Sequence, residues 1–179
     1  MNIKKVKTAI KVGEFVLRND SHRNLISFNY EENIDSILRN EDGRVYLFTS
    51  DDEIKKIGGS TAVGGIRATL NPYLTSMTGS PGAPRFVIHL LIRDLLSSGK
   101  VVNCYIITSP KIKAKVSGLF GITEMEIVSF TEMERICKTE YKEQEGRYPD
   151  WNFKENSEPY PSKYAQMHND YHKKRLDNQ

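Results

Sequence analysis

The 179-residue chain has little cysteine and no long apolar run, and both absences narrow its class. Its two cysteines, Cys104 and Cys137, lie far apart and form no C-x-x-C pair. A disulfide framework or a structural zinc site is therefore not expected. No apolar run approaches the ~20 residues of a membrane span, and the N-terminal segment lacks the apolar core of a signal peptide. These features favour a cytoplasmic protein without membrane contact.

The chain also has no large excess of positive or negative charge. The net charge is +3, with 38% hydrophobic and 27% charged residues, which is ordinary for a soluble globular domain. The length suits a single domain with a real core. A mildly basic chain permits a nucleic-acid partner but does not establish one.

Residues 44 to 57 carry the clearest pattern. Residues 45–49 are rich in β-forming side chains, and a second apolar run at 54–57 follows a short polar loop. A three-residue loop at 50–52 would pair Thr49 with Glu53 and put Tyr46 opposite Lys56, on one face of a hairpin. A two-residue loop would put these two side chains on opposite faces.

Glycines follow the hairpin, at Gly58–Gly59 and Gly64–Gly65. They allow a backbone to pass close to another backbone or to a phosphate. A short helix at 66–70 carrying Arg67 is expected next. A loop rich in Gly, Pro, Ser and Thr then spans residues 71–85, and a loop of this length in a compact domain is often functional.

The flanking segments predict a mixed domain. A strand or helix at 6–17, a strand at 25–30 and a helix at 30–38 precede the hairpin. An amphipathic helix at 86–98, a central strand at 101–108 and a strand at 125–130 follow it. His89 lies beside the apolar stripe of the helix, and a packed or surface histidine is expected there rather than a catalytic one. We therefore expect an α/β (α+β) fold: a small central sheet built on the hairpin and flanked by helices.

Lysines alternate with apolar residues between positions 111 and 116. A half-exposed strand there would display Lys111, Lys113 and Lys115 on one face. The pattern fits an edge strand protected by lysine and equally a ribbon that contacts phosphates.

A helix is expected at 131–145, with Thr131 as N-cap and Glu134 completing a capping box. At roughly 100° per residue its apolar positions form one stripe, and Glu140 falls within that stripe. A carboxylate in such a stripe needs a partner. On this pattern alone, a divalent metal ion and a buried lysine or arginine suit it equally well.

The C-terminal segment is polar, with a possible helix at 162–175. His168 and His172 have the i, i+4 spacing that could hold zinc. No acidic or cysteine ligand accompanies them in a recognisable pattern, so a surface helix with incidental histidines is the expectation.

Four features, in order along the chain, resemble the motifs of the GIY-YIG nuclease family. Arg44–Val45–Tyr46 is similar to its first motif, and Lys56–Ile57–Gly58 to its second, with lysine in place of the usual tyrosine. Arg67 stands about where the family has its arginine. Asn71 occupies the position where the family often has a histidine, so no histidine role is carried over.

The fourth feature lies near the end of the resemblance. Glu140 is twelve residues before Asn152, in a Pro149–Asp150–Trp151–Asn152 string that resembles the family's final motif. The apolar pair usual after the glutamate is Glu143–Gln144 here, which keeps Glu134 in reserve. The resemblance covers residues 44–152 as a catalytic core, with 1–43 and 153–179 as extensions of a single domain.

The resemblance implies a metal-dependent DNA endonuclease. Glu140 would hold one Mg²⁺ or Mn²⁺ per active site, and Arg67 would stabilise charge on the phosphoryl oxygens. Tyr46 would bind or deprotonate the attacking water. A phenol with a pKa of about 10 is a poor base, so Lys56 would act by favouring the phenolate. Asn152 would orient Glu140 or the backbone.

The second-motif lysine and the compact core point to a type II restriction endonuclease acting on double-stranded DNA. A homodimer is expected, because a duplex cutter needs two active sites. The same reading expects DNA contacts from Arg85, Lys111, Lys113 and Lys115. Two alternatives stay open: a phage or mobile-element endonuclease of lower specificity, and a non-catalytic DNA-binding module of the same fold.

Overall fold

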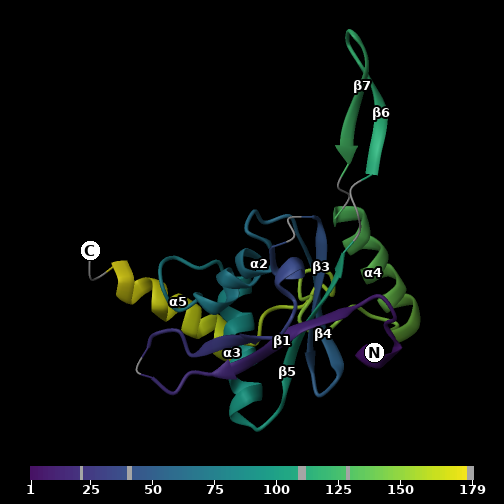
Figure 1. Ribbon diagram of the computed structural model, residues 1–179. Coiled ribbons are helices and arrows are strands. Elements are labelled where there is room, and N and C mark those ends of the chain that lie inside the picture. Colours follow the sequence, from purple (N-terminus) through teal and green to yellow (C-terminus); the bar gives the residue numbers. More distant parts are fainter. Residues whose placement is uncertain (21, 40–41, 109–111, 128–129, 177–179) are drawn as a thin grey trace.

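The computed structural model describes residues 1–20, 22–39, 42–108, 112–127 and 130–176, and it contains a five-stranded antiparallel sheet (Figure 1). The strands are β1 (Ile10–Leu17), β2 (Ile26–Tyr30), β3 (Arg44–Ser50), β4 (Glu53–Ser60) and β5 (Val102–Thr108). Their order across the sheet is β2-β1-β5-β3-β4. With helices on both faces, the structure confirms the predicted α/β class.

The sheet includes residues that were expected to extend the core. β1 pairs with β5, and β2 pairs with β1, so residues 10–30 supply two of the five strands. The segment that precedes the hairpin in sequence is thus part of the same sheet. β5 is central, as its nearly continuous apolar sequence predicted.

Alternating side chains on the strands build a core on each face of the sheet. On one face, Tyr46 and Phe48 pack against helices α2 (Gly65–Leu74) and α3 (Ala83–Ser97). On the other face, Val45 and Leu47 pack with Tyr141 of helix α4 (Phe130–Glu145), beside the short 3-10 helix η1 (Ile3–Lys5). Helix α1 (Asp35–Arg39) is a single short turn before β3.

Helix α5 (Ser162–Leu176) packs on α3 (Figure 1). Phe86, Val87 and Leu90 of α3 meet Tyr164 of α5 in a separate buried cluster. No helix among the described residues is long and apolar enough to cross a membrane.

The hairpin of β3 and β4 differs from its expected register. Its loop has two residues, Asp51 and Asp52, both with positive φ (47° and 68°), so Ser50 pairs with Glu53. This geometry is typical of a tight hairpin turn. A bulge at Lys55 then shifts the register by one residue.

Because of the bulge, Tyr46 pairs with a residue other than Lys56, but the Lys56 side chain still lies on the same face of the hairpin as Tyr46. Tyr46 lies opposite Gly58, and Lys56 lies opposite Phe48. The prediction that Tyr46 and Lys56 pair directly was wrong. The two side chains nevertheless share one face, as diagonal neighbours.

Helix α2 extends further than local sequence predicted. It continues through Pro72 to Leu74, because Leu70 and Tyr73 are buried in the core and this packing overrides the weak local propensity. Helix α3 begins at Ala83, so the expected fifteen-residue loop at 71–85 is reduced to residues 75–82.

A second hairpin, formed by β6 (Ile112–Gly118) and β7 (Gly121–Ile127), projects away from the sheet (Figure 1). It replaces the strand expected at 125–130, where Phe130 already belongs to α4. Lys113 and Lys115 are exposed on β6, whereas Lys111 lies outside the described residues.

Candidate active site

Tyr46 lies where β3, β4 and α2 meet. Its ring covers Gly58 so closely that a Cβ at that position would overlap the phenol, which explains why the site needs glycine there. Its hydroxyl is 2.7 Å from the hydroxyl of Tyr73 on α2, and either group can donate this hydrogen bond. Burial, and secondarily Tyr73, raises the pKa of Tyr46 well above its ordinary value of 10.0. Tyr46 is therefore a neutral phenol at physiological pH.

Glu134 of α4 reaches the same edge of the sheet. Its Oε2 atom lies against Gly59, where a Cβ would again overlap it. Its Oε1 atom is 2.5 Å from Nζ of Lys138, which also forms an ion pair with Glu155. The Glu134 side chain is 23% exposed, so solvent reaches this carboxylate.

The two glycines make room for groups from different elements, on opposite faces of β4. Gly58 makes room for the Tyr46 phenol and Gly59 for the Glu134 carboxylate, at neighbouring positions of the edge strand β4. After burial and the contact with Tyr73, the charge of Glu134 is a further cause that raises the pKa of Tyr46. This electrostatic coupling places the carboxylate near the tyrosine pair.

Lys56 is half-buried on the same face of the hairpin as Tyr46. Burial lowers its pKa from 10.5 to about 8; the charge of Glu155 opposes this shift and that of Lys138 adds to it. With the residues that the structure describes, its ammonium forms neither a hydrogen bond nor an ion pair. A desolvated lysine with such a pKa is typical of functional sites.

The expected stabilisation of a Tyr46 phenolate by Lys56 is not found. Burial dominates the pKa of Tyr46, and Lys56 is not among the main groups that influence it. Between the two residues, Lys56 rather than Tyr46 has a pKa close to physiological pH.

Asn152 positions the backbone of β4. It is 1% exposed, accepts a hydrogen bond from the Ile57 amide and donates one to the Ile57 carbonyl, both at 2.9 Å. The adjacent Trp151 amide donates to the carbonyl of Lys55 at 2.8 Å. Asn152 thus fixes the strand between Lys56 and Gly58, and it makes no contact with Glu140.

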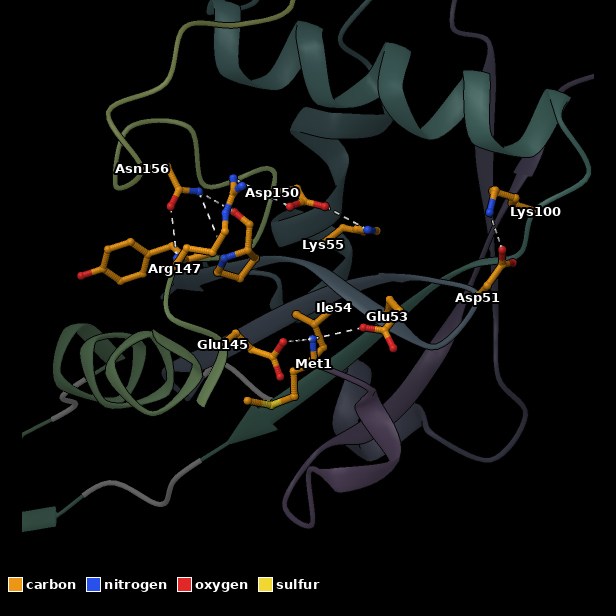
Figure 2. A network of polar contacts seen from close by, with 12 residues as sticks. Met1, Asp51, Glu53, Ile54, Lys55, Lys100, Glu145, Arg147, Asp150 and Asn156 are labelled. Carbon is orange, nitrogen blue, oxygen red and sulfur yellow. Dashed lines mark hydrogen bonds and ion pairs between the residues drawn. The ribbon is translucent and has the colours of Figure 1, made fainter. Parts of the chain in front are cut away.

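Polar contacts continue along this outer edge. Lys55 Nζ is 2.9 Å from Asp150, and Asn156 closes the 148–156 loop by accepting from the Tyr148 amide at 3.1 Å (Figure 2). At the C-terminal end of α4, the Met1 amine lies between Glu53 and Glu145, at 3.1 and 3.3 Å (Figure 2). Helix α4 and the 147–156 segment are thereby fastened to β4, which carries Lys56.

The structure does not bring Glu140 to this site. Glu140 is exposed and lines a pocket of about 630 Å³ between α4 and the N-terminal segment, together with Met1 and Leu47. The inward face of α4 carries Cys137 and Tyr141 with Glu134 and Lys138 at its border, while the apolar Ile136 is 47% exposed. Lys138 forms ion pairs with Glu134 and Glu155, so the charged groups on this face have partners. A prediction from the apolar positions alone does not include such pairs.

Arg67 lies away from the expected site, and Arg85 lies near the tyrosine pair. Arg67 is exposed on α2, and its guanidinium stacks 4.6 Å from the ring centroid of Tyr30 on β2, at the far edge of the sheet from β4. Arg85, exposed at the start of α3, lies close enough to Tyr73 for its charge to oppose the burial that raises that pKa. The arginine whose charge reaches the tyrosine pair is therefore Arg85.

Sequence reasoning missed two residues of the site, Arg44 and Tyr73. Arg44 is 1% exposed, and its Nη1 donates to the carbonyls of Ala62 and Gly65 at 3.1 and 2.9 Å and to Thr69 Oγ1 at 3.0 Å. It anchors the start of α2 to β3. An arginine at the head of an apolar strand was the only signal for this role, whereas Tyr73 lay in a segment read as a loop.

A divalent cation could use one carboxylate at this site. Among the described residues, no three His, Cys, Asp or Glu side chains group together as metal ligands. Magnesium accepts few protein ligands and keeps several waters, so this donor set fits Mg²⁺ and not a dedicated protein cage. Glu134 is a carboxylate whose charge reaches Tyr46 and Lys56, and its side chain is open to solvent.

Comparison with solved structures identifies two similar folds. A point mutant of bacteriophage T4 EndoII aligns with a TM-score of 0.53 and 18% identity, over 85% of this chain and 98% of that chain. The restriction endonuclease HPY188I in complex with product DNA aligns with a TM-score of 0.49 and 16% identity, over 83% and 84%. No protein-family model matches the sequence, and no curated protein is significantly similar to it. The likeness to EndoII shows a shared fold.

Proposed function

We propose that this chain is a metal-dependent endonuclease that hydrolyses phosphodiester bonds in double-stranded DNA, of the GIY-YIG kind that its motifs resemble. The observation that carries the proposal is that Tyr46 and Lys56 share one face of the β3–β4 hairpin and that the charge of Glu134 reaches both of them. These groups come from three separate elements of a fold shared with T4 EndoII. The likeness in fold and the motif order support the same reading.

Glu134 is the residue that would hold Mg²⁺ or Mn²⁺, in place of Glu140. A bound divalent ion would supply charge neutralisation at the scissile phosphate and at the leaving oxygen. Lys138 orients the Glu134 carboxylate through their 2.5 Å ion pair. Asn152 holds the β4 backbone in register beside it.

Lys56 is the better base for the attacking water. A general base works best when its pKa is near the operating pH, and the pKa of Lys56 is about 8. A fraction of the side chain is therefore the neutral amine, which can accept a proton. Tyr46, as a neutral phenol, would donate a hydrogen bond to the water or to a phosphoryl oxygen.

Cationic stabilisation of the phosphate would come from Arg85, with Arg67 available after leaving Tyr30. The exposed Lys113 and Lys115 would contact the DNA backbone. Within this proposal the enzyme is a type II restriction endonuclease that acts as a homodimer, since cutting both strands requires two active sites. In the alternative proposal, in which the chain is a phage endonuclease of lower specificity, the enzyme would use the same site.

Incubation of supercoiled and linear DNA with purified protein and Mg²⁺, Mn²⁺ or chelator tests the proposal. We expect metal-dependent cleavage that chelator abolishes. Discrete fragments would identify a restriction enzyme, and a smear would identify a nuclease of low specificity. Binding to duplex DNA without nicking under any of these conditions would overturn the proposal in favour of a non-catalytic DNA-binding module.

A further inference from the structure

His168 and His172 do not point incidentally into solvent. One turn apart on α5, their Nε2 atoms are 3.1 Å from each other. Both also approach the carbonyl oxygen of Pro81, in the loop between α2 and α3, at 3.1 and 3.2 Å respectively. The three atoms form a nearly equilateral triangle that joins α5 to this loop. Both histidines are half-buried.

Protons cannot satisfy all three sides of this triangle. A neutral or protonated imidazole has at most one proton on Nε2, and a carbonyl has none. If both Nε2 atoms carry protons, both donate to Pro81 and then face each other as donors. If one Nε2 is unprotonated, its lone pair faces either the carbonyl or its neighbour without a full hydrogen bond. One side therefore stays unfavourable in every protonation state.

A cation that accepts all three lone pairs removes this conflict. With metal–nitrogen distances of about 2.1 Å, neighbouring ligand atoms lie roughly 3.0 Å apart in octahedral and roughly 3.4 Å apart in tetrahedral geometry. The observed separations of 3.1 to 3.2 Å fall between these values. Imidazole selects for Zn²⁺, Cu²⁺ or Ni²⁺ over Mg²⁺ or Ca²⁺.

We propose that His168, His172 and the Pro81 carbonyl form a binding site for a borderline divalent cation such as Zn²⁺, with water completing its coordination. The site is separate from Glu134, and this proposal does not depend on the proposed function. The loop it would fasten runs from α2 to α3, and Tyr171 already holds it by donating to the Gly79 carbonyl at 2.9 Å. A bound cation would add a second, stronger attachment between α5 and this loop.

Isothermal titration of Zn²⁺ alone into chelator-treated protein without a histidine tag tests this site. We expect one Zn²⁺ per chain in the wild type. Loss of an outer-shell partner typically weakens metal binding 10- to 100-fold, so loss of a direct ligand in His168→Gln or His172→Gln should cost at least about tenfold. Circular dichroism of each variant shows that it is folded.

Two matched controls make the result specific. His22→Gln removes an exposed histidine elsewhere, and Glu134→Gln removes the carboxylate of the other site; both should bind Zn²⁺ like the wild type. Equal affinity of the wild type and both α5 variants, or no stoichiometric binding by the wild type, would overturn the proposal. Loss of the site in Glu134→Gln but not in the α5 variants would also overturn it.

Discussion

Lys56→Met should make the protein more stable at neutral pH while it abolishes catalysis. Burial lowers the pKa of Lys56 from 10.5 to about 8, and each unit corresponds to about 1.36 kcal/mol. Keeping this lysine charged in the folded protein at pH 7 therefore costs at most about 3 kcal/mol. Methionine has a similar length and no charge, so it should recover much of this cost. Such a gain in stability with loss of function is typical of active-site substitutions.

The pH dependence of this gain identifies its cause. Between about pH 8 and pH 10.5 the folded wild type loses the Lys56 proton while the unfolded chain keeps it. Wild-type stability should therefore rise with pH through this window, relative to the variant. The advantage of Lys56→Met should fall to about 1.4 kcal/mol at pH 9.5 and vanish above pH 10.5.

Urea unfolding of both proteins at pH 7 and pH 9.5 measures this difference. Lys55→Met is the matched control, because Lys55 is adjacent, partly exposed and ion-paired with Asp150. Its loss should change stability by no more than about 1 kcal/mol, in the destabilising direction. The reasoning is refuted if Lys56→Met is less stable than the wild type at pH 7, or if its advantage is the same at both pH values.

Three further predictions concern the same site. Gly58→Ala should lower stability by about 1–3 kcal/mol and reduce cleavage, because its Cβ overlaps Tyr46; urea unfolding and a cleavage assay measure both, and wild-type behaviour would contradict the close approach. Asn152→Ala should cost about 2–4 kcal/mol, because it leaves the buried amide and carbonyl of Ile57 unpaired; a loss below 1 kcal/mol in the same unfolding assay would show that these bonds matter little. The cleavage rate should rise with pH through a midpoint near 8, as Lys56 loses its proton, and a rate that falls over this range would exclude it as the base.

Periodicity in the sequence predicted much of the fold. The hairpin, the central strand and the helices at 86–98, 131–145 and 162–175 all correspond to observed elements. Each carries a long or strongly patterned apolar run, so its local signal agrees with its burial. His89 was expected to be a packed or a surface histidine, and it is buried with Nδ1 2.7 Å from the Tyr73 carbonyl.

The register of the β3–β4 hairpin and the identity of the proposed metal-binding carboxylate could not be derived from sequence periodicity. A one-residue bulge at Lys55 decides which residue faces Tyr46, and no residue type in the sequence specifies a bulge. The side of α4 that turns inward is supported by the ion pair of Lys138 with Glu155, a contact between α4 and a later segment of the chain. The apolar stripe together with the spacing to Asn152 in the family motif therefore selected Glu140.

The most direct test of the proposed site compares Glu134→Gln with Glu140→Gln in a Mg²⁺-dependent DNA cleavage assay. Both substitutions remove one charge from α4 and keep the side-chain size, so they form a matched pair. We predict that Glu134→Gln loses cleavage by several orders of magnitude while Glu140→Gln cuts at nearly the wild-type rate. Cleavage that survives Glu134→Gln and is lost in Glu140→Gln would contradict the account and return the metal to the exposed face of α4.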